Sequence, residues 1–316
     1  MSPDPQSSDL RLVFMGTPEF AVPSLDALVE AGYRPSAVVT VPDRPKGRGQ
    51  TLQPSAVKEA AARHDLWVLQ PERLDDPEFI IELRDLEPEV IAVVAFRILP
   101  PEVYSLATKG AFNLHASLLP RYRGAAPINR AIMAGELETG VTTFLLEPTV
   151  DTGDVLLKRR LGIGPDETAG ELHDRLAELG AEVVVETVQH LEAGTAETRM
   201  QDDSRASKAP KIFKEDAEID WSRSAQEVHN HVRGLSPYPA AWTTHDGTLL
   251  KVYRTEIEKG SGEPGEVIEA NSDSLVVACG KRAVAIREIQ REGKSKMTAE
   301  EFLNGYTFQP GDRLGA

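Results

Sequence analysis

The sequence predicts an α/β protein in which a doubly wound parallel sheet forms the first domain and a small OB-like β-barrel forms the second. Strand-like and helical segments alternate over the first 115 residues, a pattern typical of crossover units on a parallel sheet. Short β-like runs with glycine-rich turns fill the last third of the chain, as in small barrels. A length of 316 residues fits two domains of about 100–200 residues each.

The first domain is expected to begin with an apolar strand and a helix whose apolar residues recur near the helical period. In chain order the alternation gives a strand at 10–15, a helix at 20–31, strands and helices at 37–41, 56–63, 67–69, 77–86, 90–95 and 100–106, and a strand at 111–115. Ligands on such sheets bind beyond the carboxyl ends of the strands. The loops after the strands are therefore the expected site.

The rest of the chain completes the first domain and adds the second. We expect a helix at 128–134, two further strands at 141–146 and 155–161, and a long amphipathic helix at 169–191. Residues 194–210 are polar and small, which is typical of a linker. The second domain is expected to contain a helix at 225–233 and strands at 249–253, 265–268, 275–278 and 283–289. The predicted division is 1–193, 194–210 and 211–316.

The composition narrows the class of protein. Hydrophobic residues make up 41% of the chain and charged residues 27%, values that are ordinary for a globular protein. No run reaches the roughly 18 apolar residues of a membrane span, and the first nine residues do not resemble a secretory signal. The single cysteine, Cys279, cannot form an internal disulfide, which favours a cytoplasmic location.

The net charge of −15, from 35 basic and 50 acidic residues, argues against a protein that coats nucleic acid, because neutralising phosphates requires a cationic surface. It leaves room for a local basic site. Residues 281–296 hold six basic and two acidic side chains. That run fits a solvated strand and loop as well as it fits an RNA contact.

The strand at 111–115 carries a polar pair. Asn113 and His115 point to the same face, since side chains alternate along a strand. An imidazole can take a proton from a nucleophile, and an amide N–H can bond a developing oxyanion, so the pair suits acyl transfer. The simpler interpretation is a polar strand end that caps backbone groups.

Asp151 is the candidate partner for the imidazole, because a carboxylate can orient a histidine and stabilise its cation. It stands in the sequence Asp-Thr-Gly-Asp, which is also ordinary turn chemistry between two strands. Spacing along the chain does not decide whether Asp151 meets His115.

The loop at 41–54 is long and carries Arg44, Lys46 and Arg48 among glycines. A mobile cationic finger of this kind suits phosphate or nucleic-acid contact, and a flexible solvated loop is the alternative. Neither a dinucleotide fingerprint nor a P-loop is present in the sequence. His229 and His231 are two residues apart on the helix expected there and so do not share a face, which argues against a metal site there.

Two stretches carry a specific resemblance. The segment AFNLHASLLPRYRGAAPI followed by VDTGDVL resembles the signature of the formyltransferases that use 10-formyltetrahydrofolate. LVFMGTPEFAVPSLDAL, PDRPKGRGQTLQPSAVK, IDWSRSAQEVHNHVRGLSPYPAAW and PGEVIE extend the similarity over nearly the whole chain. The combination is most similar to the members of that family that act on aminoacylated initiator tRNA.

The resemblance implies a Rossmann-like formyltransferase domain and an OB-like C-terminal domain that touches the tRNA, with the run 281–296 in the latter. It implies transfer of the formyl group of 10-formyltetrahydrofolate to the α-amine of methionine on initiator tRNA, by a monomer, with no metal and no covalent enzyme intermediate. The implied catalytic residues are Asn113, His115 and Asp151. The implied folate-contacting loop is Ser117, Leu118, Leu119 and Pro120. The basic loop would approach the acceptor stem, with Arg48 as its key arginine.

One stretch departs from the family pattern. Ala95, Phe96 and Arg97 stand where the family often has Ala-Tyr-Gly in a loop that borders the folate pocket, and this loop is one residue shorter here. Other family members stay as alternatives: a sugar N-formyltransferase, a glycinamide ribonucleotide formyltransferase and a formyltetrahydrofolate hydrolase. An RNA-binding module on an inert scaffold is the alternative outside enzymes, but it leaves the three polar residues without a purpose.

Overall fold

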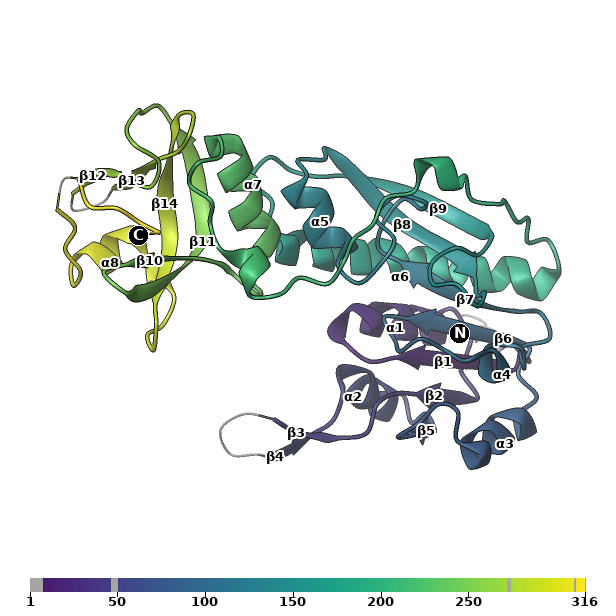
Figure 1. The fold of residues 1–316 in the computed structure, drawn as a ribbon. Helices are drawn as coiled ribbons and strands as arrows, with labels where there is room; N and C mark the ends of the chain where they lie inside the picture. Colours follow the sequence, from purple (N-terminus) through teal and green to yellow (C-terminus); the bar gives the residue numbers. More distant parts are fainter. Residues whose placement is uncertain (1–7, 47–50, 272–273, 310, 316) are drawn as a thin grey trace, which may run out of the picture. The chain divides into compact units, whose positions relative to one another are not determined.

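A computed structural model describes residues 8–46, 51–271, 274–309 and 311–315 (Figure 1). The chain forms two compact units that interleave in sequence. The first contains Met1–Gly124, Gly140–Leu161 and His173–Lys208, and the second contains Ala125–Thr139, Gly162–Leu172 and Ala209–Ala316. The division at 194–210 stays a prediction about domains, and the structure adds that two earlier segments pack with the C-terminal unit.

The first unit is built on a seven-stranded sheet. The strands, in spatial order, are β5 (Val68–Leu69), β2 (Ala37–Val39), β1 (Leu12–Gly16), β6 (Val90–Val94), β7 (Gly110–His115), β8 (Glu138–Leu145) and β9 (Val155–Gly162). The first five run parallel, and β8 runs antiparallel to β7. The chain starts in the middle of the sheet and works outward in both directions, as the alternation of strands and helices predicts.

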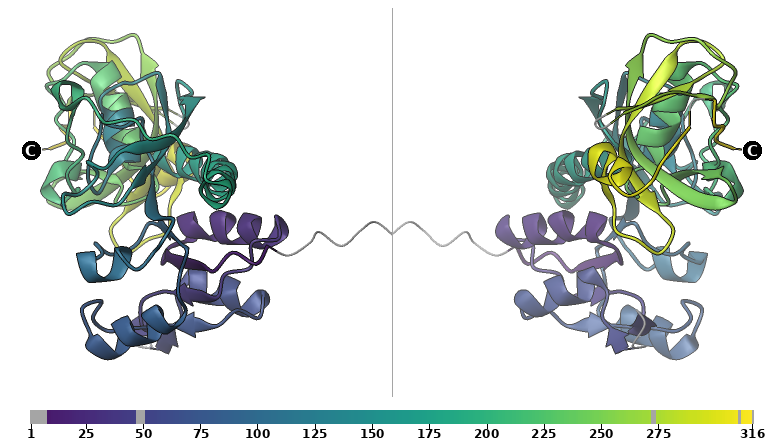
Figure 2. Two further views of the ribbon diagram at one scale, coloured as in Figure 1. Left: turned by 90° about the vertical axis from the view of Figure 1, so that its right-hand side faces the viewer. Right: turned by 90° about the vertical axis from the view of Figure 1, so that its left-hand side faces the viewer.

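Helices cover both faces of the parallel part of the sheet. α3 (Pro77–Asp85) and α4 (Pro101–Tyr104) share a core with alternate residues of β1 and β6. α1 (Val22–Glu30) and α2 (Ala56–Arg63) pack on each other on the opposite face. Figure 2 draws α1 in purple in both of its views, with α3 and α4 in blue. Both faces of the central strands are therefore apolar, and polar side chains collect at the ends of the strands.

The long helix α6 (Ala169–Ala193) packs against β7 and β8. A Cβ added at Gly180 would lie 2.6 Å from Cδ2 of Leu114, so the absence of a side chain lets the helix approach β7 closely. The hydroxyl oxygens of Thr143 and Thr187 are 2.8 Å apart, which ties the helix to β8. Leu114 therefore faces α6, and its neighbours Asn113 and His115 face the other way.

The second unit is an antiparallel β domain with a six-stranded sheet. Its strands are β10 (Ala241–His245), β11 (Thr248–Glu258), β12 (Val267–Ala270), β13 (Leu275–Ala278), β14 (Ala283–Arg291) and β15 (Met297–Thr298). α7 (Ala225–Leu235) begins with a capping box between Ser224 and Glu227. Together with the first unit, this confirms the predicted fold class. β10, β15 and the short helix α8 (Ala299–Leu303) were not expected from the sequence.

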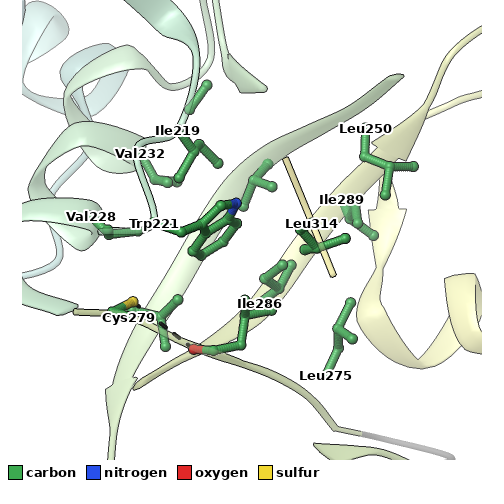
Figure 3. Close-up of a cluster of buried hydrophobic side chains, with 14 of the residues drawn as sticks. Ile219, Trp221, Val228, Val232, Leu250, Leu275, Cys279, Ile286, Ile289 and Leu314 are labelled. Carbon is green, nitrogen blue, oxygen red and sulfur yellow. Dashed lines mark hydrogen bonds between the residues drawn. The ribbon is translucent and has the colours of Figure 1, made fainter. Parts of the chain in front are cut away.

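A large apolar cluster lies in the second unit (Figure 3). Val232, Leu250, Ile286 and Ile289 are fully buried there, and the indole N–H of Trp221 donates to Thr243 Oγ1 over 3.1 Å. Cys279 lies in the same cluster. Burial raises the pKa of its thiol to about 12. Cys279 is therefore a buried residue of the core.

The segment expected to be a linker belongs to the first unit as far as Lys208. Val155 and Arg199 exchange backbone hydrogen bonds of 2.8 and 2.9 Å, so the segment adds an extended backbone beside β9. A polar composition is typical of linkers, but here the backbone groups find partners on the domain that precedes them.

In the described ranges, no helix is long and apolar enough to cross a bilayer.

Candidate active site

The carboxyl end of β7 presents the predicted polar pair. Asn113 lies level with Val93 of β6 and Phe144 of β8, on the face that α3 and α4 cover. Asn113 is half-buried, and His115 is 6% exposed. The strand therefore holds an amide and an imidazole on one face, at the margin of the sheet where open α/β folds bind ligands.

Asp151 approaches the imidazole from the turn between β8 and β9. Its Oδ2 is 3.9 Å from Nδ1 of His115, and the carboxylate is 8% exposed. The backbone N–H of Gly124 donates to the same Oδ2 over 2.9 Å. Asp151 has a φ of +59°, a conformation that aspartate and asparagine adopt more readily than most residues. The structure thus brings together two residues that are 36 positions apart in the sequence.

A backbone carbonyl fixes the protonation pattern of His115. Nε2 is 2.8 Å from the carbonyl oxygen of Tyr122, and because a carbonyl only accepts, Nε2 carries a proton. In the neutral ring, Nδ1 then has the free electron pair and faces Asp151. A proton taken up at Nδ1 would sit beside a carboxylate in a poorly solvated place, where the attraction between opposite charges is strong.

The residues expected to touch folate form a tightly bonded turn. Ser117 is fully buried, and its hydroxyl donates to the carbonyl of Arg121 over 2.6 Å. Thr142 Oγ1 donates to the Ser117 carbonyl over 2.7 Å and accepts from the Leu119 N–H at 3.2 Å. The Ser117 hydroxyl is therefore engaged within the protein, and this residue shapes the turn.

The second half of the same turn is held from β9. Lys158 donates through Nζ to the carbonyl of Leu119, and the peptide bond between Leu119 and Pro120 is cis. Burial, more than the neighbouring arginines, lowers the pKa of Lys158. Leu118 packs over Gly140, where an added Cβ would lie 2.7 Å from Leu118 Cδ2. Neither Thr142 nor Lys158 carried a signal in the sequence, because their role depends on strand pairing.

A cavity of about 120 Å³ opens beside the polar residues. Asn113 and Asp151 line one part of it, and Phe96 and Arg97 line another. Arg97 donates to the carbonyls of Pro71 and Glu72 at 2.9 Å each, and its guanidinium lies 5.1 Å from the centroid of the Phe96 ring. The shortened loop therefore forms a defined wall in which Arg97 is anchored by the backbone.

The basic loop contains two short strands that were not expected. β3 (Arg44–Lys46) pairs with β4 (Thr51–Gln53) in an antiparallel hairpin. Arg44 is exposed, and so is Leu52, at 65%. Arg48 lies outside the described residues. Within the described residues, this part of the loop is therefore a pair of short strands.

The basic run 281–296 is partly neutralised where it forms β14. Arg287 contacts Glu256 at 2.5 Å, and Lys296 contacts Glu288 at 2.7 Å. Arg287 is therefore paired with a carboxylate from outside the run, whereas Glu288 is one of the two acidic residues of the run itself, and Lys296 lies beyond the end of β14. As for metals, the described parts of the chain hold no group of three or more histidine, cysteine, aspartate or glutamate residues that could bind an ion.

Comparisons with known proteins define the class. The formyl transferase family model matches residues 10–188, and the formyl transferase C-terminal domain matches residues 211–307. A curated methionyl-tRNA formyltransferase from Geobacter sulfurreducens is 50% identical over 307 residues, which cover 97% of each chain. The chain therefore belongs to the methionyl-tRNA formyltransferase family.

Solved structures share the fold at lower identity. An N-formyltransferase from Helicobacter canadensis, described in complex with folinic acid and dTDP-3-aminofucose, has a TM-score of 0.68 at 19% identity, covering 89% of this chain and 99% of its own. HypX from Aquifex aeolicus in complex with tetrahydrofolic acid has a TM-score of 0.64 at 21% identity, covering 96% of this chain and 49% of its own. At these identities the similarity concerns the fold alone.

Proposed function

We propose that Asn113, His115 and Asp151 carry out the transfer of the formyl group of 10-formyltetrahydrofolate to the α-amino group of methionyl-initiator tRNA. The product, N-formylmethionyl-tRNA, serves translation initiation. The observation that supports this assignment is the approach of Asp151 to His115 at 3.9 Å, beside Asn113 and a cavity at the sheet edge. Family membership gives the reaction, and this geometry supports the proposed roles.

The proton that the amine releases is proposed to go to the unprotonated ring nitrogen of His115. The neutral amine attacks the formyl carbon, the bond from that carbon to the donor nitrogen breaks, and the amine gives up a proton. His115 receives this proton at Nδ1, because Nε2 already donates to Tyr122. Asp151 stabilises the resulting cation. The His115 cation then gives this proton to the departing nitrogen of the donor, so the charges balance and neither a metal nor a covalent enzyme intermediate is needed.

Asn113 supports the charge that develops on the formyl oxygen. Its amide N–H can donate into the cavity that it lines. A single fixed donor to a developing oxyanion contributes about 3–4 kcal/mol in other acyl-transfer sites. The amide carries no charge of its own, so it does not compete with Asp151 for the imidazole cation.

The folate donor is assigned to the cavity beside Asn113. Phe96 offers an aromatic face, and Arg97 offers a cation on its wall. The turn from Ser117 to Pro120 contributes shape, since the Ser117 hydroxyl is already bonded to Arg121. The two related structures described with folinic acid and tetrahydrofolic acid are consistent with a folate donor on this fold.

The acceptor is assigned to the basic hairpin and the C-terminal domain. Arg44, Lys46 and Arg48 would contact the phosphates of the acceptor stem, and residues 211–316 would contact the body of the tRNA. Phosphate contacts supply affinity and position. The polar catalytic residues all come from one unit, which supports a monomeric enzyme. The single cysteine supports a location in the cytoplasm.

A comparison of acceptors tests this function. The protein is incubated with 10-formyltetrahydrofolate and, separately, with methionyl-initiator tRNA, a nucleotide-linked amino sugar, or buffer alone. We expect formylation of the aminoacylated tRNA only. Formylation of the amino sugar would identify a sugar N-formyltransferase, and release of formate in buffer alone at a comparable rate would identify a hydrolase.

A further inference from the structure

Gln201 is buried in the segment that the sequence identifies as a linker. The residue is 8% exposed, whereas its neighbour Met200 is 87% exposed. A buried amide costs free energy unless its donors and its acceptor are all bonded. Gln201 meets that condition entirely within the first unit.

The two ends of the Gln201 amide join two different loops. Nε2 donates to the carbonyl of Asp151 over 3.0 Å and to the carbonyl of Gly153 over 2.8 Å. Oε1 accepts from Arg123, at 2.8 Å from Nη2 and 3.2 Å from Nε. Because a primary amide combines two N–H donors with an acceptor of two lone pairs, this arrangement uses all of its hydrogen-bonding capacity.

Both loops carry the groups that hold the His115–Asp151 pair. Asp151 itself stands in one of them. Arg123 stands in the other, between Tyr122, whose carbonyl accepts from His115, and Gly124, whose N–H donates to Asp151. Gln201 therefore closes a ring of hydrogen bonds that runs through the carboxylate, both loops and the amide.

The same segment holds the second loop at one more point. The Tyr122 N–H donates to Ser207 Oγ, and the Arg123 N–H donates to the Ser207 carbonyl, each at 2.9 Å. The segment thus accepts hydrogen bonds from the backbone on both sides of the carbonyl that orients His115. These hydrogen bonds explain why a segment with a composition typical of linkers packs on the first unit.

We infer that Gln201 is a positioning residue for formyl transfer, acting through the His115–Asp151 pair. The inference rests on the proposed roles of these two residues. Gln201 lies outside the cavity beside Asn113, to which the folate donor is assigned; it lines a separate cavity of about 600 Å³ together with Pro120 and Lys158. It sets the separation of the carboxylate from the imidazole, and misplacement of reacting groups by about 1 Å costs up to about 10²-fold in rate.

Two substitutions of Gln201 remove its hydrogen bonds in different ways. Gln201→Glu keeps an acceptor for Arg123 but removes both donors, and it places a negative oxygen against the two carbonyls. Gln201→Met is similar in size and neutral, and it removes every hydrogen bond. We expect kcat for methionyl-tRNA formylation to fall by about 10- to 100-fold in both, with the KM for tRNA within about two-fold of the original value. Met200→Ala is the control and leaves both constants unchanged.

A double substitution distinguishes positioning from general damage. In a His115→Ala background, Gln201→Met should lower kcat by less than about two-fold, because a positioning residue acts only through the group it positions. Independent effects that multiply in the double variant would overturn the inference, as would a normal kcat in both single Gln201 variants. If His115→Ala itself keeps a normal kcat, the proposed function fails instead, so the two failures are distinguishable.

Discussion

The first unit contains two polar regions of opposite construction. Around His115 and Asp151, both side chains are nearly buried, and backbone groups at Tyr122 and Gly124 hold them at 2.8 and 2.9 Å. In the basic hairpin, the two strands pair with each other and, within the described residues, with no other strand, and Arg44 is exposed to solvent. The His115–Asp151 site is held in place by the protein before a substrate binds, whereas the basic hairpin exposes positive charge to solvent.

The contrast indicates how catalysis and affinity are divided. A preorganised site lowers the barrier because its groups need no rearrangement during the reaction. An exposed cation contributes to the attraction of a polyanion, which weakens with salt. Substitutions in the first region should therefore change kcat, and substitutions in the second should change KM and its dependence on salt.

The largest effect is expected from His115→Ala. Removal of the general base should lower kcat by at least about 10²-fold and leave tRNA affinity nearly unchanged. His173→Ala, at a half-exposed histidine of the same unit, is the control. Steady-state kinetics with methionyl-tRNA measure both constants, and a near-normal kcat in His115→Ala would remove the general-base assignment.

A smaller effect, of different kind, is expected from Arg44→Ala and Arg48→Ala. Each should raise the KM for tRNA several-fold, and loss of each phosphate contact should reduce the slope of log affinity against log salt by about 1. Arg48→Ala should also lower kcat where misplacement of the amine disturbs its approach. Arg73, an exposed arginine paired with Asp75, supplies the control substitution. An unchanged salt slope in both hairpin variants would assign tRNA affinity elsewhere.

A substitution of Glu171 is expected to have an intermediate effect. Glu171 is a half-exposed carboxylate that caps the start of α6. Hydrogen bonds from Thr168, and further ones from Arg254, lower its pKa from 4.5 to about 2. A lowered pKa stabilises the fold above the ordinary value, and this stabilisation is lost as the pH falls from about 4.5 towards 2.

The matching substitution is Glu171→Gln, which keeps a capping side chain without the charge. At neutral pH it should lower the free energy of unfolding by less than about 1 kcal/mol, since the pair is half-exposed. Denaturation by urea at several pH values measures the difference, which should vanish near pH 2. A difference that is constant over this range would show that the ion pair does not contribute.

The smallest effect is expected from Cys279, which is buried but takes no part in either region. With its pKa raised to about 12 by burial, the thiol carries almost no thiolate at pH 8. A thiol reagent should leave the native protein unlabelled and should modify one thiol per chain in denaturant, because the sequence has a single cysteine. Rapid labelling of the native protein would place Cys279 outside the core.

Much of this organisation follows from local sequence signals. Strand alternation places Asn113 and His115 on one face, and their position at the carboxyl end of a parallel strand predicts that they lie in a ligand site. The contact of Asp151 with His115 is not local, because it depends on how the turn after β8 folds back. Gln201 shows the same limit more sharply. Its segment has the composition of a linker, and only tertiary hydrogen bonds reveal that it holds two loops.

The two short strands of the basic hairpin were missed for a related reason. Each has only three residues, and prolines and glycines surround them, so the local pattern favours a loop. Pairing between Arg44 and Gln53 provides what the local preference lacks. The helix α8 carried a readable signal, a capping box from Thr298 to Glu301, that periodicity over five residues does not reveal.

The charge of Asp151 is the feature on which the account depends most. Asp151→Asn suits the left-handed backbone at this position and keeps an acceptor for Gly124, so the substitution removes little besides the charge. Asp154→Asn makes the same chemical change three positions along the turn. The measurement is the single-turnover rate of formylation with both substrates saturating. We predict a fall of about 10²-fold or more for Asp151→Asn and a normal rate for Asp154→Asn; a normal rate in Asp151→Asn would contradict the account.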